Sequence, residues 1–312
     1  MKNYLFNYYP AFKCIASKCK HTCCAGWEIK IDSESLIKYK RENSSFSLAL
    51  KKGINFRKSK FKTGKNKRCA FLNKNGLCDL ITNLGEESLC AVCSSHPRFE
   101  NFFSDRIETG LDFACEEATR IILSFSDKIS PILHSSDNGE ERLTFIEERI
   151  LDFREKAVSL IYDDKKPLNE KVTNLLSLCK ASVTKSDFNK IIKTFMRFER
   201  LDKSWSARLK KLKGKTFPLT IGESLQKNYE QFLVNSLYKH ISSAEDVLGA
   251  QARTIAVILS LWIINSIFSS EKGGNDDFNL LCDIVRAYSS EVEYSEKNLI
   301  SLYDFSYKFI KK

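Results

Sequence analysis

Apolar residues recur at helical spacing through most of the chain after residue 143. In the segment Leu143 to Tyr162, for example, Ile146, Ile150 and Phe153 fall near one face of a helix. Proline would interrupt such helices, and the whole chain contains only five. The same spacing predicts further helices over residues 186–198, 223–241, 244–268, 276–289 and 295–310. We therefore expect residues 143–312 to form an α-helical bundle.

The first 125 residues have a different pattern, in which short apolar pieces alternate with turn residues and cysteines. The segment Trp27–Asp32 alternates apolar and polar residues, which predicts a short strand. One helix is expected over Ser33–Arg41, with Ser33 as its N-cap, and another over Glu116–Phe125. The residues Asn73–Gly76 predict a tight turn.

Together these patterns predict a mainly α protein. Residues 1–125 would form a small cysteine-rich domain with little strand, residues 126–142 a linker, and residues 143–312 the helical domain. The most apolar stretch, Ile255–Phe268, is shorter than the roughly 20 residues of a spanning helix and predicts a buried core helix. Residues 1–14 lack the apolar segment of a signal peptide, so we expect a cytoplasmic protein that does not contact a membrane.

Cysteine is concentrated in the first part of the chain. The protein has 11 cysteines, and those before residue 116 are Cys14, Cys19, Cys23, Cys24, Cys69, Cys78, Cys90, Cys93 and Cys115. In a reducing compartment such a cluster indicates metal binding rather than disulfides. Four thiolates satisfy a tetrahedral zinc ion or the corners of a cubane iron–sulfur cluster. The spacing matches neither paired zinc knuckles nor the bacterial ferredoxin motif, so it leaves the metal open.

Two of these cysteines, Cys23 and Cys24, are adjacent. Neighbouring side chains reach the same metal ion only where the backbone turns sharply, and otherwise each serves a different iron or a different site. Gly26 follows closely and gives the backbone the freedom for such a turn.

Several other residues are weaker candidates for the metal site. His21 and His96 are possible additional ligands, although a single histidine is more often an ordinary surface or core residue. Cys90 is either a ligand or a neighbour of Cys93, because the two form the chain's C-x2-C pair. The remaining two cysteines, Cys179 and Cys282, have helical, apolar surroundings and are expected to be buried small side chains.

The net charge of +11 favours acidic partners. The sharpest basic run, Lys51–Arg68, contains no acidic residue. It could contact RNA or an acidic protein, but such runs are more often solvated surface, here a loop between two groups of cysteines. Nucleic acid is therefore an unfavoured partner that this run leaves open. The P-loop, dinucleotide-binding, nucleophile-elbow and H-E-x-x-H signatures are all missing from the chain.

The ordered series of cysteine motifs resembles the flagellin lysine-N-methylase family (FliB-type proteins). The pieces are F-x-C-x4-C-x3-C-C-x-G-W, C-x-F-L-x4-L-C, a G-E pair, C-x3-P-R and C-x-E-A. They lie at Phe12–Trp27, Cys69–Cys78, Gly85 and Glu86, Cys93–Arg98, and Cys115–Ala118. Some of them are also similar to a wider zinc- or iron-chelating family. The stretch Asn228–His240 resembles the C-terminal half of the methylase family.

The resemblance implies an enzyme that transfers methyl groups from S-adenosylmethionine to lysines of flagellin. It also implies an iron–sulfur cluster of the four-iron type (4Fe-4S), with zinc as the alternative. Position by position, its metal ligands would be Cys14, Cys19, Cys23, Cys24, Cys69, Cys78, Cys93 and Cys115. One cubane needs only four, so either a subset binds or there are two sites. Glu116 replaces the usual proline of the family, and Cys90 is additional.

The matched motifs also contain charged residues that suit methyl transfer. Arg98 could pair with the carboxylate of the cofactor, and Glu86 or Glu117 could orient the lysine amine. Each of the three could instead form a structural ion pair between the cysteine loops. The sequence is also compatible with two other kinds of protein: a non-catalytic metal-binding or metal-delivery protein, and an RNA-binding protein with a structural zinc site.

Overall fold

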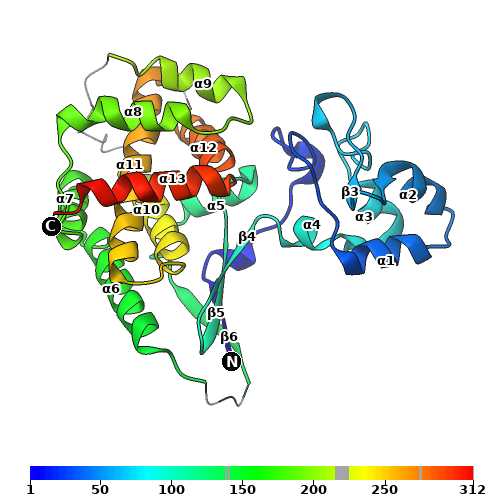
Figure 1. Cartoon of the computed structure of the whole chain (residues 1–312), viewed down its shortest axis with the longest axis horizontal. Helices are drawn as coiled ribbons and strands as arrows, with labels where there is room; N and C mark the ends of the chain where they lie inside the picture. The colour runs from blue at the N-terminus through cyan, green and yellow to red at the C-terminus, as the bar shows by residue number, and fades with distance from the viewer. Residues whose placement is uncertain (138, 140, 215–224, 274–275, 312) are drawn as a thin grey trace. The chain divides into compact units, whose positions relative to one another are not determined.

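A computed structural model describes residues 1–137, 139, 141–214, 225–273 and 276–311. The chain forms two compact units (Figure 1). The cysteine-rich unit comprises Lys13–Arg98 and Cys115–Glu117, and the helical unit comprises Met1–Phe12, Phe99–Ala114 and the chain from Ala118 onward. The protein is mainly helical, as the apolar periodicity predicts.

The limits of these units differ from the expected ones, in which a cysteine-rich domain ended at residue 125 and a linker ended at residue 142. Residues 1–12 and 99–114 pack with the helices because they contribute strands whose aromatic side chains need a helical partner. The ring of Phe6 lies 4.9 Å from that of Tyr238 and 5.8 Å from that of Phe99, centroid to centroid. Residues 131–136, expected within a linker, form the strand β6.

A four-stranded sheet in the helical unit has the order β4-β5-β1-β6. Its strands are β1 (Lys2–Phe6), β4 (Arg98–Phe102), β5 (Arg106–Leu111) and β6 (Pro131–Ser136). β1 runs parallel to β5 and antiparallel to β6. Gly110 on β5 allows the close packing, because a Cβ atom there would lie 2.4 Å from the ring of Phe99. The sequence patterns predict none of these strands.

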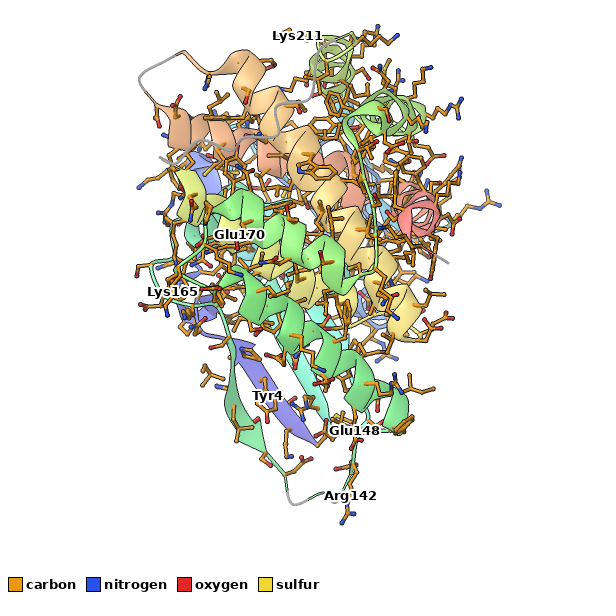
Figure 2. The ribbon with its side chains drawn as sticks, turned by 90° about the vertical axis from the view of Figure 1, so that its left-hand side faces the viewer. Tyr4, Arg142, Glu148, Lys165, Glu170 and Lys211 are labelled. Carbon is orange, nitrogen blue, oxygen red and sulfur yellow. The ribbon has the colours of Figure 1, made fainter. Side chains whose placement is uncertain are left out.

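Helices make up the rest of this unit. They are α5 (Glu116–Ser124), α6 (Phe145–Ile161), α7 (Leu168–Leu178), α8 (Phe188–Arg197), α9 (Lys203–Lys210), α10 (Gln226–Ile241), α11 (Val247–Glu271), α12 (Asp277–Tyr288) and α13 (Glu296–Ser306). α6 and α7 pack on each other and on α11. Their exposed side chains, such as Glu148 and Glu170, point outward (Figure 2). The predicted helices are confirmed within the described residues, whereas the sequence patterns do not predict α7 and α9. Residues 223 and 224 of the helix predicted over 223–241 lie outside the described residues.

The central helix α11 contains the apolar stretch Ile255–Phe268, whose prediction as a buried core helix is confirmed. By length and composition alone α11 could cross a membrane, although 78% of its most apolar window is buried within the protein. The neighbouring α10 is also buried along most of its length. These two helices form the centre of the helical unit.

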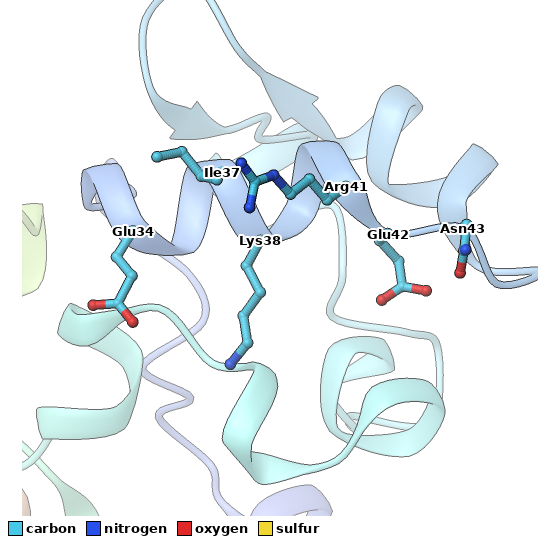
Figure 3. A pocket seen from close by; sticks show the side chains of 6 residues that line it. All are labelled: Glu34, Ile37, Lys38, Arg41, Glu42 and Asn43. Carbon is cyan, nitrogen blue, oxygen red and sulfur yellow. The ribbon is translucent and has the colours of Figure 1, made fainter.

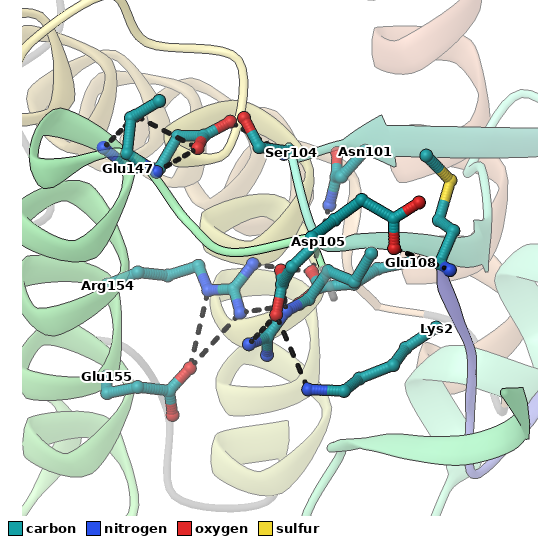
Figure 4. Close-up of polar contacts among 12 residues, drawn as sticks. Lys2, Asn101, Ser104, Asp105, Glu108, Glu147, Arg154 and Glu155 are labelled. Carbon is teal, nitrogen blue, oxygen red and sulfur yellow. Dashed lines mark hydrogen bonds and ion pairs between the residues drawn. The ribbon is translucent and has the colours of Figure 1, made fainter. Parts of the chain in front are cut away.

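A buried ion pair connects the sheet to the helices (Figure 4). The guanidinium of Arg154 on α6 donates to both carboxylate oxygens of Glu108 on β5, at 2.6 and 2.9 Å. The same guanidinium lies 4.7 Å from the ring centroid of Tyr238 on α10, and Asn101 donates to the carbonyl of Tyr238 at 3.0 Å. This arrangement satisfies two charges that would otherwise be costly to bury.

The cysteine-rich unit contains short elements around its own apolar core. They are α1 (Ser33–Arg41), α2 (Ser47–Gly53), β2 (Ile54–Asn55), β3 (Lys60–Phe61), α3 (Asp79–Leu84), α4 (Ala91–Ser95) and the 3-10 turns η2 (Ala16–Lys18), η3 (Lys65–Lys67) and η4 (Glu86–Ser88). The turn at Asn73–Gly76 is confirmed, because the N–H of Gly76 donates to the carbonyl of Asn73 at 3.1 Å.

Two local predictions in this unit are wrong. The segment Trp27–Asp32 forms only an isolated bridge, between Lys30 and Lys60, because its partner strand β3 is two residues long. The N-cap of α1 is Asp32 rather than Ser33, and its carboxylate accepts the N–H of Ser35 at 2.8 Å. Asp is as good an N-cap as Ser, so the sequence allows either position.

Candidate metal centre

Backbone hydrogen bonds bring the first two cysteine motifs of the cysteine-rich unit together. The N–H of Cys69 donates to the carbonyl of Cys24 at 2.8 Å, and the N–H of Gly26 donates to the carbonyl of Lys67 at 3.3 Å. Gly26 has φ +96°, a backbone conformation that favours glycine. The predicted turn after Cys24 is therefore present, and it positions Cys24 beside Cys69.

The turn after Cys69 positions the next thiol. Leu72 pairs with Cys78 in an isolated bridge, and the side-chain oxygen of Asn73 accepts the N–H groups of Asn75 and Leu77, at 2.9 and 3.1 Å. Cys78 is the N-cap residue of α3. The Asn residue that marks the turn in the sequence thus also holds the loop closed.

Asp32 links the start of α1 to the C-x2-C pair. Its Oδ1 accepts the N–H of Ser35, and its Oδ2 accepts the N–H of Ala91, both at 2.8 Å. Cys90 is the N-cap residue of α4, and its carbonyl accepts the N–H of Cys93 at 2.9 Å. Asp32 is a positioning residue that the sequence patterns did not identify.

Four cysteines of the family motif contact one apolar core, and we call them the inner group: Cys24, Cys69, Cys78 and Cys93. Cys69 is buried in that core, and the other three pack against it while partly buried. Cys90 is also buried there, and its thiol hydrogen-bonds to that of Cys93. The cysteine that the family pattern does not require is therefore a direct neighbour of a candidate ligand.

The other four form the outer group: Cys14, Cys19, Cys23 and Cys115. None of them is part of the apolar core. The hydrogen bond with the Cys24 thiol and burial raise the pKa of the Cys23 thiol, and the charges of Cys115 and Cys14 add smaller contributions. Burial is also the main cause that raises the pKa of Cys19. Cys14 and Cys23 are exposed, whereas Cys19 and Cys115 are half-buried.

Glu116 fixes the loop that carries Cys19. Its Oε2 accepts the N–H groups of Lys20 and His21, at 2.9 and 3.2 Å, and the Cys19 thiol at 3.7 Å. This residue stands where the methylase family usually has proline. Because Glu116 follows Cys115 directly, its contacts bring two distant cysteines of the outer group together.

All 11 cysteines are free thiols, so no pair forms a disulfide. Within the described residues, no group of three or more His, Cys, Asp or Glu side chains has an arrangement that could hold a metal ion. The donor atoms nevertheless suit zinc or iron, because thiolates are the ligands that both favour. The set of donors fits a metal centre, and metal binding would have to draw the sulfur atoms closer together.

The surroundings of the thiols shift their acidity in opposite directions. Burial raises the pKa of Cys69 to about 11 and also raises that of Cys78. Hydrogen bonds from the Cys23 thiol and the Thr22 hydroxyl lower the pKa of Cys24 to about 7, although burial opposes them. The shared hydrogen bond raises the pKa of Cys23 well above its usual value. A metal would therefore bind one thiolate that already exists near neutral pH and displace protons from the others.

Two further cysteines and the two candidate histidines have different surroundings. Cys179 and Cys282 are buried in the helical unit, which confirms their prediction as core residues. His21 is exposed, and its backbone N–H donates to the carboxylate of Glu116 at 3.2 Å. His96 is the C-cap residue of α4. Nothing in the structure assigns either histidine to a metal.

The predicted catalytic and cofactor-binding residues lie on three different elements. Glu86 is exposed in η4, and Glu117 is half-buried in the first turn of α5. The guanidinium of Arg98 donates to the carbonyls of Ser94 and His96, at 2.9 and 3.4 Å. For Arg98 these contacts favour a structural role at the end of α4.

The basic run Lys51–Arg68 is a folded hairpin rather than a loop. It includes the end of α2, the paired strands β2 and β3, and η3. Phe61 is buried in the apolar core of the unit, while most of the lysines and arginines of the run are exposed.

A surface pocket of about 410 Å³ lies along α1 in the same unit (Figure 3). Its lining residues are Glu34, Ile37, Lys38, Arg41, Glu42 and Asn43. These residues include no cysteine, so the pocket is distinct from both groups of thiols.

Comparisons with known proteins find two similar bacterial proteins, each matched over part of this chain. The lysine-N-methylase of Salmonella typhimurium is 29% identical over 127 residues, which is 38% of this chain and 32% of that protein. The flagellar biosynthetic protein FliU of Salmonella muenchen has the same identity over 127 residues, 75% of its length. The chain thus spans about a third of the lysine-N-methylase. No family model matches the chain, and no solved structure matches it significantly.

Proposed function

This chain is a homologue of the FliB-type lysine-N-methylases over 127 of its residues, and we propose that it is a protein-lysine N-methyltransferase. The observation that carries the proposal is this relationship, which two differently named relatives share. The ordered cysteine motifs, which lie together in one compact unit, support it. Both relatives are matched over only part of this chain, so the activity of the whole protein is part of the proposal.

In the proposed reaction, a methyl group is transferred from S-adenosylmethionine to a lysine of flagellin in the cytoplasm. The neutral amine nitrogen attacks the methyl carbon of the sulfonium, a C–N bond forms, and the C–S bond breaks to release the thioether. The proton of the new ammonium group leaves to a base or to water. Catalysis requires an enzyme that aligns the two reactants and supplies the base. Flagellin is proposed because one relative is named as a flagellar biosynthetic protein.

We assign the metal-binding role to the thiols of the cysteine-rich unit, with an iron–sulfur cluster as the first choice and zinc as the second. Once bound, such a centre would cross-link loops that otherwise rest on a small apolar core and a few backbone hydrogen bonds. Asp32 and Glu116 orient the loops that carry the thiols.

Charged residues near the thiols in sequence remain candidates for the chemistry. Glu86 and Glu117 are proposed to orient or deprotonate the lysine amine. Arg98 is proposed to pair with the carboxylate of S-adenosylmethionine, in competition with its contacts to the carbonyls of Ser94 and His96.

Methyl transfer from labelled S-adenosylmethionine tests the proposed activity. The full chain, purified and metal-loaded without oxygen, is incubated with flagellin, and lysine methylation is located by mass spectrometry. We expect label on lysines of flagellin and none when flagellin is chemically acetylated beforehand. A metal-loaded protein that transfers no label to flagellin would refute the proposal and favour a non-catalytic metal-binding protein.

Arg98→Ala tests the proposed contact with the cofactor. Loss of a charge-assisted hydrogen bond costs about 1.5–3 kcal/mol, so the dissociation constant for S-adenosylmethionine should rise by roughly tenfold or more. Isothermal titration measures it, and Arg57→Ala, which alters an exposed arginine of the same unit, is the matched control. If affinity is unchanged while the metal content is intact, Arg98 has no part in cofactor binding.

A further inference from the structure

We propose that the basic hairpin, Lys51–Arg68, is a docking surface for an acidic segment of the protein substrate. The inference rests on the proposed function and deepens it, because methyl transfer to a lysine does not by itself explain how the enzyme recognises a whole protein. The hairpin contains none of the candidate metal ligands or candidate catalytic residues. Its role is therefore a separate question, which its charge, folding and aromatic residues answer together.

Positive charge is concentrated in the cysteine-rich unit. This unit contains 18 lysines and arginines against nine aspartates and glutamates. It therefore carries +9 of the net charge of +11, and the helical unit is close to neutral. The hairpin supplies nine of the 18 cations and has no acidic residue. A field of this kind attracts acidic partners and steers their approach.

The fold brings cations from both arms of the hairpin together. The strands β2 and β3 pair with each other, and the N–H of Lys62 donates to the carbonyl of Gly53 at 2.7 Å. Lys62 on one arm thus lies near Lys52 on the other, ten residues earlier in the chain. Phe61 is buried in the apolar core and anchors the hairpin to the unit. The exposed cations are Lys51, Lys52, Arg57, Lys58, Lys62, Lys65, Lys67 and Arg68.

Little of this charge is neutralised by neighbouring acids. Lys60 forms an ion pair with Glu28, whereas none of the exposed cations of the hairpin forms an ion pair with a carboxylate of the described residues. Lys60 also lies opposite Lys30 in an isolated bridge, and like charges in opposite positions destabilise a pairing. An acidic partner would replace this repulsion with favourable ion pairs.

The aromatic residues of the hairpin favour a protein partner over single-stranded RNA, which needs exposed rings on which its bases stack. Phe61 is buried, and Phe56 packs against the same apolar core. The ammonium group of Lys40 also lies 5.9 Å from the ring centroid of Phe56. The hairpin therefore presents charge without a stacking surface. Most of its cations are lysines, which lack the planar fork with which arginine binds phosphate.

The same charge excludes the hairpin as the place where the target lysine reacts. Exposed lysines repel the ammonium group of a substrate lysine, so the hairpin would bind a different part of the substrate, one that presents carboxylates. A contact remote from the reacting atoms is equally strong in the ground state and in the transition state. Its loss therefore raises KM and leaves kcat unchanged.

Substitution of four exposed lysines of the hairpin tests the inference in the metal-loaded full chain. The hairpin variant is Lys51→Gln/Lys52→Gln/Lys58→Gln/Lys62→Gln. The matched control removes the same charge from exposed positions of the helical unit and is Lys165→Gln/Lys193→Gln/Lys203→Gln/Lys210→Gln. Because each exposed ion pair contributes modestly, the loss of four should raise the KM for flagellin by about tenfold at low salt, with kcat unchanged. The control should keep the wild-type KM.

Salt dependence gives a second measurement, which needs no variant. The KM of the wild-type protein for flagellin should rise with salt, and at about 1 M salt it should equal that of the hairpin variant, because exposed charges are then screened. A wild-type KM that does not change with salt would contradict an electrostatic docking surface. If the four substitutions impair folding, Arg57→Gln/Lys65→Gln/Lys67→Gln removes three other exposed charges of the hairpin and should also raise the KM.

Direct binding distinguishes the classes of partner. Analytical ultracentrifugation gives dissociation constants for monomeric flagellin, poly-L-glutamate and polyuridylate at one ionic strength. We expect the hairpin variant alone to bind flagellin and poly-L-glutamate about tenfold more weakly than the wild type. If the wild type binds polyuridylate more tightly than poly-L-glutamate, and the hairpin variant loses that binding, the partner is RNA and the inference is wrong. Equal losses in both four-lysine variants would show only an effect of net charge and would also overturn it.

Failure of the docking surface and failure of the proposed activity give different results. A protein that binds flagellin through the hairpin but transfers no methyl group would refute the activity and leave the docking surface in place. A methylase whose hairpin variant has the wild-type KM and the wild-type affinity for flagellin would refute the docking surface alone.

Discussion

Asp32 illustrates how one carboxylate organises a loop that carries candidate metal ligands. It caps α1 and at the same time accepts the N–H of Ala91, next to Cys90. These hydrogen bonds lower the pKa of Asp32 from 3.8 to about 2. Because the pKa is lower in the folded state, the ionised cap stabilises the fold fully above the unfolded value and is lost as the pH falls from about 4 to 2.

Asp32→Ala should destabilise the cysteine-rich unit by about 1–2 kcal/mol at neutral pH, because an N-cap carboxylate is lost. The difference in the free energy of unfolding between the variant and the wild type should decrease as the pH falls below 4. Urea unfolding followed by the fluorescence of Trp27, in a protein that lacks the other two tryptophans, measures it. Glu34→Ala changes an exposed acid of the same helix and should cost less than about 0.5 kcal/mol. Equal effects of the two variants would contradict the capping role.

Glu116 has a comparable role in the outer group. Besides burial, its negative charge contributes to raising the pKa of Cys19 to about 11. In the metal-free protein, Glu116→Gln should therefore lower that pKa and speed the alkylation of Cys19 by iodoacetamide at pH 8, since the thiolate is the nucleophile. Peptide mass spectrometry measures the rate, with Cys69 as the internal reference. An unchanged ratio of the two rates would show that the charge of Glu116 does not reach Cys19.

Among the secondary-structure elements, the buried pair of Arg154 and Glu108 connects the sheet, α6 and α10. The hydroxyl of Ser242 accepts a further hydrogen bond from Arg154 at 2.7 Å. Removal of one partner of such a pair leaves an unpaired buried charge, whereas removal of both can be nearly neutral. The pair is therefore more important for the mutual position of these elements than for net stability.

Arg154→Met should destabilise the helical unit by about 3–5 kcal/mol, since Glu108 is then buried without a partner. Glu108→Gln/Arg154→Met should recover much of this loss. Urea unfolding followed by circular dichroism provides the measurement. Lys156→Ala breaks an exposed ion pair on the same helix and should cost under about 1 kcal/mol. If the double variant is as unstable as the single one, the unpaired carboxylate is not the cause.

A second buried charge cluster lies where α12 continues into a π-helical turn, Ser289–Glu293. The Nζ of Lys239 on α10 lies 2.5 Å from Oδ2 of Asp112 and 3.0 Å from Oε2 of Glu293. The Nε2 of His240 lies 2.9 Å from Oε1 of Glu293. Although burial opposes ionisation, the charge of Lys239 and a hydrogen bond with His240 hold the pKa of Glu293 well below its usual value. The lysine is therefore the counterion of two buried carboxylates.

Lys239→Met should raise the pKa of Glu293 above its unfolded value, because burial then acts on this carboxylate without the charge of the lysine. A raised pKa stabilises the fold at low pH, so the variant should lose stability as the pH rises through the new value, unlike the wild type. The difference at pH 7 should be about 3–5 kcal/mol. Urea unfolding between pH 4 and 8 tests this, with Lys227→Met, an exposed lysine of α10, as the control. Parallel pH profiles of the variant and the wild type would contradict it.

For the chain as a whole, the two units should respond differently to metal. The cysteine-rich unit has a small apolar core of its own, so metal–thiolate bonds would add substantially to its stability. The helical unit has a larger buried core around α10 and α11 and contains only two cysteines.

Removal of metal with a chelator under reducing conditions should weaken the cysteine-rich unit alone. We expect faster amide hydrogen exchange in residues 13–98 and little change in α10 and α11. Because protons compete for the thiols, metal affinity should also fall as the pH decreases from 8 to 6. Uniform loss of protection across the chain would show that the two units unfold as one.

Much of the helical architecture could be predicted from the chain alone. Helical periodicity is a local property, and α6, α8 and α12 follow it, whereas α10 and α11 are buried along most of their length. The concentration of thiols at one end likewise identified the candidate metal ligands without any coordinates. The strands could not be predicted, because β1 pairs with residues about a hundred positions away, such as Lys2 with Arg106.

The composition of the two thiol groups depends on long-range contacts in the same way. Spacing alone does not assign Cys23 and Cys24 to different groups, since that assignment depends on which distant cysteines each one meets in the folded chain. The sequence patterns assign no positioning role to the carboxylates of Asp32 and Glu116, and these roles follow from N–H groups that other segments present to them. Local patterns thus specify the helices and the donor atoms, whereas packing of distant segments specifies which donors come together.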